Sequence, residues 1–306
     1  MSERRTPEEL WELLERNVSG WPHERLQQHG FDLLFGDPER LAKDRRAHAR
    51  KVLVAQHALA DQVEHHQTPV IVMKGLEVAM LYPRPIERPF RDLDILVRDP
   101  RPRWDRLVEQ GHRKSPKRAI DIDHHHLPAL EHPTGVLGIE LHHSPNLPGW
   151  AKIPNDLIFE TAQPSRTGIE GALRPRDDIH ALLLALHCWK GGFQRLRDFF
   201  DALLLANQPG SGVEDLARRL GLSRLWTQSR RLADQHLLGS QAKPVRLQRW
   251  FVPQSSELAW RRWSNIIAPY AAANPIVVTR CHAQTIARSR RHSAASDREA
   301  SSLKVG

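Results

Sequence analysis

Residues 70–97 read VIVMKGLEVAMLYPRPIERPFRDLDILV, and this stretch decides the fold that we expect of the chain. It overlaps a short apolar run rich in β-branched residues, Pro69–Met73, which is typical of a buried strand. Leu76–Tyr82 then has the pattern of a two-turn helix. The prolines at 83, 85 and 89 exclude a regular helix. Asp92–Val97 finally alternates polar and apolar residues, as a half-buried strand does.

Asp92 and Asp94 are the candidate metal ligands of this stretch. Because residues i and i+2 of a strand point to the same face, the two carboxylates are expected side by side. Their mutual repulsion is relieved by a divalent cation, and Mg²⁺ prefers oxygen ligands together with substrate phosphates. Glu140 is the candidate third carboxylate, because it lies in the predicted strand Gly135–His142. Such a carboxylate can also accept the proton of an attacking hydroxyl.

A phosphate-binding turn is expected where the first strand ends, at Lys74-Gly75. A glycine just before a helix lets a phosphate approach the backbone, where the N-terminus of the helix favours negative charge. A metal site next to a phosphate cradle provides the parts that phosphoryl transfer requires.

The remaining sequence is read mainly as helix, so the expected fold class is α+β, with a small mixed β-sheet flanked by N- and C-terminal helices. Further predicted elements are a helix capped by Thr6, helices at about 38–66 and 104–110, a strand at 120–130, and helices from Asp177 onward. The expected division is an N-terminal helical segment (1–67), the core (68–160), a C-terminal helical region (161–272) and a flexible basic tail (273–306).

The motifs of this chain resemble those of a poorly characterised bacterial nucleotidyltransferase family of the polymerase-β-like superfamily. The resemblance covers about residues 50–205 and rests on several motifs in combination. They are Lys74-Gly75, Leu81-Tyr82-Pro83, Arg88, Asp92-Leu-Asp94, His126-Leu-Pro128, Ile139-Glu-Leu-His142, His187 and Arg195-Leu-Arg-Asp198.

The resemblance implies transfer of a nucleoside monophosphate from a nucleoside triphosphate to an acceptor hydroxyl, with release of pyrophosphate. It also implies two Mg²⁺ ions, with Mn²⁺ as an alternative, bound by Asp92, Asp94 and Glu140. Gly75 would lie under the triphosphate. The superfamily at large has Gly-Ser or Gly-Gly where this chain has Lys74-Gly75, and its step to the first aspartate is shorter than the step from Gly75 to Asp92 here.

Three further side chains are assigned as nucleotide contacts. Lys74 and Arg88 offer positive charge to the phosphates in place of the missing serine. The alternative for Lys74 is a cap on the strand, and for Arg88 a pairing with Asp92 or Asp94. His142 is expected near the carboxylates, where it touches phosphate or positions Glu140.

Composition limits the possible partners. The chain has 45 Lys and Arg residues and 36 Asp and Glu residues, which gives a net charge of +9 and a pI of about 10.0. A basic surface suits polyanions, but we interpret it as a solvated arginine-rich surface rather than an RNA-binding one. Two distant cysteines predict neither a disulfide framework nor a zinc site. No segment has the length of a membrane helix, and a cytoplasmic location is expected.

Two other functions stay open at this point. One is a toxin-like transferase that modifies tRNA, and the other is a non-catalytic module that binds a nucleotide or a partner protein. The acceptor stays open between a small molecule, a peptide or protein, and RNA. A zinc cluster built from Asp121, Asp123, His124–His126, His142 and His143 is disfavoured, because adjacent histidines in a strand point to opposite faces. For His187 and Asp198 we favour core packing or a hydrogen bond from the helix to the site.

Overall fold

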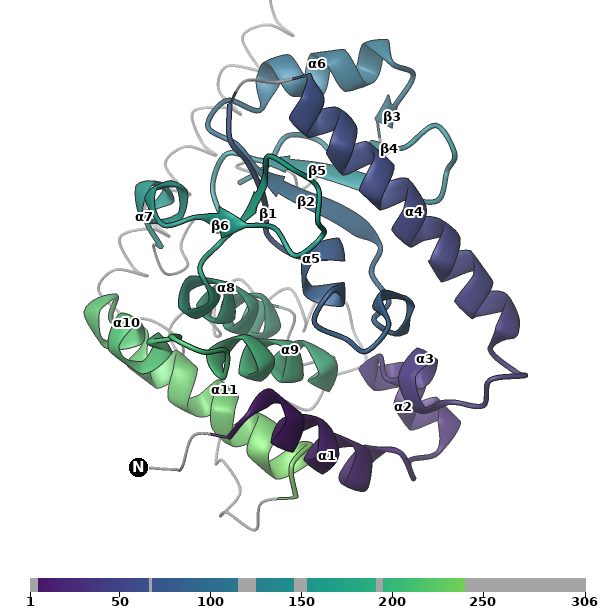
Figure 1. Ribbon diagram of the computed structural model, residues 1–306, viewed down its shortest axis with the longest axis vertical. Helices are drawn as coiled ribbons and strands as arrows, with labels where there is room; N and C mark the ends of the chain where they lie inside the picture. The colour runs from purple at the N-terminus through teal and green to yellow at the C-terminus, as the bar shows by residue number, and fades with distance from the viewer. Residues whose placement is uncertain (1–4, 66–67, 115–124, 146–152, 191–194, 240–306) are drawn as a thin grey trace, which may run out of the picture.

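The computed structural model describes residues 5–65, 68–114, 125–145, 153–190 and 195–239. These residues form one mixed sheet of seven strands in the order β3-β4-β5-β2-β1-β7-β6, surrounded by helices (Figure 1). The predicted α+β class is therefore confirmed. The strands are β1 (Val70–Val72), β2 (Asp92–Leu96), β3 (Arg113–Lys114), β4 (Leu130–Glu131), β5 (Gly138–His142), β6 (Gln163–Pro164) and β7 (Ala172–Arg174).

Two parallel pairings, β2 with β5 and β1 with β7, join strands that are distant in sequence. The other pairings in the sheet are antiparallel. Strands β6 and β7 extend the sheet beyond residue 160, where the core was expected to end. Strand β2 lies between β5 and β1, so both of its edges are paired.

The helices cover the two faces of the sheet differently (Figure 1). Helix α4 runs along one face, and α1 with α8 to α11 forms a bundle on the other. Their bounds are α1 (Pro7–Val18), α2 (His23–His29), α3 (Asp32–Phe35), α4 (Ala42–Glu64), α5 (Leu76–Ala79), η1 (Pro85–Glu87), α6 (Arg101–Glu109), α7 (Asn155–Glu160), α8 (Asp177–Lys190), α9 (Leu196–Ala206), α10 (Val213–Arg219) and α11 (Ser223–His236).

The alternation of strand β2 decides which face carries polar groups. Leu93 and Ile95 are buried in the hydrophobic cluster that includes α4, whereas Leu96 belongs to the cluster of the helical bundle. Asp92 and Asp94 share a face with Leu96, because side chains two residues apart in a strand point the same way. The two aspartates therefore lie on the side of the sheet that α8 and α9 cover.

Several elements form where local sequence signals predict them. Helix α1 begins with a capping box, in which Thr6 accepts a hydrogen bond from the Glu9 backbone and Glu9 accepts one from the Thr6 backbone. The predicted helix at 38–66 is α4, Ala42–Glu64. Helix α6 starts at Arg101, three residues before the predicted start.

The prediction of a two-turn helix at Leu76–Tyr82 is wrong, because α5 is a single turn that ends at Ala79. Tyr82 lies beyond this end, and its buried hydroxyl donates a hydrogen bond to Asp201 on α9, 2.8 Å away. The prolines that follow prevent the helix from continuing.

Other predictions fall partly or wholly outside the described residues. The strand predicted at 120–130 is described only from residue 125, and there only Leu130 belongs to a strand. The expected helices at 240–272 and the basic tail at 273–306 lie outside the described ranges.

Candidate active site

Strand pairing brings the predicted carboxylates together. In the parallel pair of β2 and β5, Asp94 lies opposite Glu140, and Asp92 lies opposite Gly138. The absence of a side chain at Gly138 leaves space beside Asp92, whose Cβ would be 3.6 Å from an added Cβ. The acids thus share one face at the centre of the sheet.

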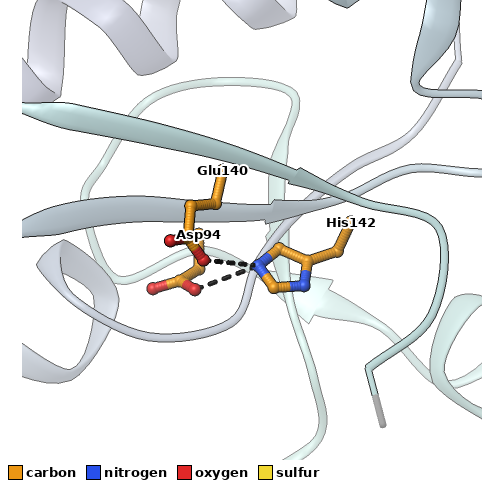
Figure 2. Close-up of side chains that lie close together, drawn as sticks. All are labelled: Asp94, Glu140 and His142. Carbon is orange, nitrogen blue, oxygen red and sulfur yellow. Dashed lines mark hydrogen bonds and ion pairs between the residues drawn. The ribbon is translucent and has the colours of Figure 1, made fainter. Parts of the chain in front are cut away.

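His142 joins the two strands through its ring (Figure 2). Its Nε2 lies 3.0 Å from Oδ1 of Asp94 and 3.5 Å from Oε2 of Glu140. One oxygen from each carboxylate and one nitrogen of His142 lie within 4.8 Å of one another, as ligands of a single metal ion would. His142 and Asp94 are each 1 % exposed, so this arrangement is held by the core and not by surface contacts.

Lys74 supplies the nearest positive charge. The residue follows β1, and the antiparallel pairing of β1 with β2 carries its Nζ to 2.7 Å from Oδ1 of Asp94. The pairing continues past the strand, because the Met73 amide donates to the Asp94 carbonyl at 3.0 Å. Lys74 therefore does more than cap the strand end.

The two aspartates differ in their protonation behaviour. Burial and the neighbouring charge of Asp94 raise the pKa of Asp92 to about 7. Burial would also raise the pKa of Asp94, but Lys74 and the hydrogen bond from His142 hold it well below its usual value. Asp94 is therefore ionised at neutral pH, whereas Asp92 is held near its titration point by the charges around it.

The pKa values of Glu140 and His142 shift in the directions that an ion pair between them would cause. Burial opposes ionisation of Glu140, but the hydrogen bond from His142 lowers its pKa. Burial likewise opposes the charged form of His142, yet the hydrogen bonds to Asp94 and Glu140 raise its pKa. The imidazole thus supports both carboxylates in their ionised form.

The residues at this site fit a divalent cation. The Oδ2 atom of Asp94 is buried and has no hydrogen-bond partner among the described residues. An uncompensated buried carboxylate oxygen is costly unless a cation or a donor reaches it. The carboxylates that surround it are the hard oxygen ligands that Mg²⁺ and Mn²⁺ take.

Gly75 has a backbone that other residues rarely adopt, with φ +59° and ψ −111°. A Cβ at this position would lie 2.5 Å from the backbone oxygen of Asp92. The glycine is therefore required for the close approach of the turn to the first aspartate. The helix that it precedes is a single turn, so the expected contribution of a helix N-terminus to phosphate binding is small.

Arg88 pairs with neither Asp92 nor Asp94. Its Nε and Nη2 donate to Oδ2 of Asp201 at 3.0 and 2.7 Å, and its Nη1 donates to the Gly75 carbonyl at 3.3 Å. Because Arg88 is 5 % exposed and Asp201 is fully buried, this pair fixes the turn at Gly75 against α9.

A small pocket of about 150 Å³ opens between the carboxylates and the helical bundle. Lys74, Asp92 and Asp94 line one side, and His187, Arg195 and Asp198 line another. The side chains of His187 and Asp198 thus reach the pocket as well as the helices. This position favours the hydrogen bond from helix to site over core packing alone.

Residues 4–238 match a family described as uncharacterised nucleotidyltransferase. The match spans most of the 306 residues. The chain belongs to this family. The resemblance found in the sequence motifs is therefore confirmed, and membership supports a role in nucleotidyl transfer. Neither the comparison with curated proteins nor that with solved structures found a match.

The candidate site includes a histidine group that the sequence analysis did not predict correctly. The rings of His125 and His126 lie 4.7 Å apart, and each lies within 5.0 Å of His142. The expectation that adjacent histidines point to opposite faces fails, because residues 125 and 126 do not belong to a strand of regular alternation. Asp121, Asp123 and His124 lie outside the described residues.

Asp201 is the residue that sequence reasoning missed. It accepts hydrogen bonds from Tyr82 and Arg88, both of which belong to the family motifs. A buried acid on an apolar helix was the available signal, because such a residue requires a partner. Among the described residues of this family member, no helix is long and apolar enough to cross a membrane.

Proposed function

We propose that the protein transfers a nucleoside monophosphate from a nucleoside triphosphate to the hydroxyl group of an acceptor and releases pyrophosphate. The observation that carries the proposal is the acid-rich cluster on β2 and β5, in which Asp94 keeps a buried oxygen without a partner among the described residues. Family membership supplies the class of reaction.

Asp92, Asp94 and Glu140 would hold the divalent cations of this reaction. Two Mg²⁺ ions are proposed, with Mn²⁺ as an alternative. When bound, they would neutralise negative charge on the phosphate oxygens and on the leaving pyrophosphate. His142 contributes by holding Asp94 and Glu140 in place through one ring nitrogen.

The turn after β1 is proposed to receive the triphosphate. Lys74 uses one N–H on Asp94, and an ammonium group has two further donors for phosphate oxygens. Gly75 allows the phosphates close to the backbone. Arg88 supports the turn by binding the Gly75 carbonyl while Asp201 holds its guanidinium. Its contribution to nucleotide binding is therefore mainly one of positioning.

The transfer exchanges one phosphorus–oxygen bond for another. The acceptor oxygen attacks the α-phosphorus, and the bond from this phosphorus to the bridging oxygen of the β-phosphate breaks. Glu140 is proposed to accept the proton of the hydroxyl, since its lowered pKa keeps it ionised at neutral pH. Pyrophosphate leaves with the electron pair of the broken bond.

Label transfer tests this proposal directly. The protein is incubated with Mg²⁺, each α-labelled nucleoside triphosphate and a lysate of the source cells divided into RNA, protein and small-molecule fractions. We expect label in one fraction with the wild-type protein and none with the Asp92→Asn/Asp94→Asn variant. Asp215→Asn is the matched control, because Asp215 is exposed on α10 and is not among the residues that line the pocket.

Each outcome separates the proposal from its rivals. Label in the RNA fraction would favour the tRNA-modifying alternative, and label in another fraction would name a different acceptor class. Nucleotide binding without label in any fraction would contradict transfer and favour a non-catalytic module. If the double variant transferred as much label as the wild-type protein, Asp92 and Asp94 would have no role in the reaction.

Lys74→Gln tests the nucleotide-binding role separately. We expect the KM for the nucleoside triphosphate to rise about tenfold, because a charged donor to phosphate is lost. An unchanged dependence of the rate on nucleotide concentration would assign Lys74 to the support of Asp94 alone.

A further inference from the structure

A second and larger pocket adjoins the candidate active site. It has a volume of about 640 Å³ and lies among α2, α3, α4 and the loop before β2. Arg91, Arg195 and Arg197 line both this pocket and the smaller one beside Asp92 and Asp94. We name the larger one the cationic pocket, after Lys51, Arg91, Arg195 and Arg197 in its lining.

Three of the four cations lack an anionic partner among the described residues. The side chains of Lys51, Arg91 and Arg195 make no hydrogen bond or salt bridge with any residue that the structure describes. Only Arg197 is engaged, through Nη1 to the Pro89 carbonyl at 2.8 Å and Nη2 to Asp198 at 3.1 Å. Positive charge therefore gathers here, and no described residue forms a direct ion pair with Lys51, Arg91 or Arg195.

The cations also disfavour one another. Burial lowers the pKa of Arg195, and the charge of Arg197 lowers it further. Burial also lowers the pKa of Lys51, with a contribution from Arg91, while the charge of Asp92 acts in the opposite direction. Like charges held this close cost free energy, and a bound anion recovers that cost.

The pocket is polarised along α4. The three arginines line both pockets, so they mark the end next to the candidate active site, and Lys51 contributes its charge from α4. Asp44 lies seven residues earlier on the same helix, which is about 10 Å along the axis. Asp44 and Asp32 both line the pocket. A ligand with anionic groups at one end and hydrogen-bond donors at the other matches this distribution.

We infer that the cationic pocket binds phosphate groups of a substrate, with its hydroxyl or amino groups toward Asp32 and Asp44. The inference rests on the proposed function for the source of the phosphates. They belong either to the triphosphate of the nucleotide or to a phosphorylated acceptor. Both sources share the chemistry that Lys51, Arg91 and Arg195 recognise.

Calorimetric titration with inorganic tripolyphosphate, at one fixed ionic strength, tests the pocket without any turnover. We expect Lys51→Gln/Arg91→Gln to raise the Kd at least tenfold. The matched control is Lys43→Gln/Arg46→Gln, which removes the same charge from exposed positions on α4 outside the pocket, and it is expected to change the Kd less than twofold. Absence of binding to the wild-type protein, or equal losses in the two variants, would overturn the inference.

Two further arms identify the source. Weaker binding of the nucleoside triphosphates to Lys51→Gln/Arg91→Gln would place the nucleotide phosphates in the pocket. A phosphorylated acceptor would be placed there by a different result. In that case the variant has an unchanged nucleotide Kd and a raised KM for the acceptor fraction, and phosphatase treatment of that fraction abolishes the difference in KM. No effect on either would overturn the assignment to a substrate.

The titration also separates this inference from the proposed transfer. If the wild-type protein labels no fraction but loses tripolyphosphate binding only in Lys51→Gln/Arg91→Gln, the pocket stands and nucleotidyl transfer falls. If label transfer succeeds and this variant binds tripolyphosphate as the wild-type protein does, transfer stands and the pocket falls.

Discussion

Two buried charged clusters lie near strand β1. In one of them every carboxylate has a cationic partner, whereas in the other a buried carboxylate oxygen has no hydrogen-bond partner among the described residues. On helix α5, Glu77 is fully buried and Arg166 donates to it at 3.1 Å, while Arg174 donates to Asp177 at 2.7 Å. Ser165 also donates to Glu77. Two acids thus meet two arginines, and each carboxylate is paired.

The active-site cluster has no such balance. Asp92, Asp94 and Glu140 face one lysine, Lys74, and two histidines, His126 and His142. One Asp94 oxygen still has no hydrogen-bond partner among the described residues. A cluster that serves only stability is expected to pair its charges, as the Glu77 cluster does. The excess of acids next to β2 is therefore a signal of function, and the bound cation that we propose would balance it.

The largest expected effect breaks function and leaves the fold intact. Glu140→Gln removes the proton acceptor and a metal ligand, so we expect the rate of label transfer to fall by about 10²–10³. Glu131→Gln on the exposed end of β4 is the control and should retain full activity. A Glu140→Gln protein with an unchanged rate would contradict the assigned role.

Glu77→Ala, in the Glu77 cluster, is expected to lower stability and to leave activity unchanged. It leaves Arg166 and Arg174 without one of their two acids, so the free energy of unfolding should fall by about 3 kcal/mol. The activity of the protein that remains folded should be unchanged. Urea denaturation measures the loss. The control is Glu170→Ala, at an exposed position in the loop that also contains Arg166. A loss of activity without a loss of stability would contradict this prediction, because the Glu77 cluster would then serve function as the other cluster does.

Gly75→Ala tests the close approach between the turn and β2. Gly111→Ala is the control, because it has a positive φ of 89° but nothing within 4 Å of an added Cβ. We expect Gly111→Ala to lower the unfolding free energy by about 1 kcal/mol and Gly75→Ala by about 2–3 kcal/mol. Only Gly75→Ala should also reduce activity, because Asp92 must shift. Equal losses of stability would show that the contact with Asp92 is soft.

Asp92→Asn should stabilise the metal-free protein, which Glu77→Ala does not. The folded pKa of Asp92, about 7, lies above its unfolded value, so its stabilising contribution is present at low pH and is lost as pH rises. The advantage of the Asp92→Asn variant over wild type should grow from about pH 4 to about pH 7 and then level off at about 4 kcal/mol.

Thermal unfolding across this pH range checks the effect of Asp92→Asn. Added Mg²⁺ or Mn²⁺ should raise the melting temperature of the wild-type protein more than that of the variant, because bound cation stabilises only the folded state. A variant that is less stable than wild type at pH 8 without metal would refute the repulsion between Asp92 and Asp94.

The cytoplasmic location and the division at residues 67, 160 and 272 stay predictions. The assignment of Asp92, Asp94, Glu140, Lys74, Gly75, Arg88 and His142 to metal and nucleotide binding is a proposal that these experiments test.

Local sequence determined what depends on neighbouring residues. The spacing of Asp92 and Asp94 on a strand fixed their common face, and Thr6 with Glu9 fixed the start of α1. The family motifs determined the class of protein. These features follow from periodicity and capping, which act over a few residues and are therefore visible in the sequence.

Only the tertiary structure decided which distant residues meet. The parallel pairing of β2 with β5 set Glu140 opposite Asp94, and the fold of α9 over the turn placed Asp201 under Arg88. The same packing gathered Lys51, Arg91 and Arg195 from three separate segments. Strand period fixes the direction of a side chain but not its partner strand, because register and pairing are decided by burial across the whole core.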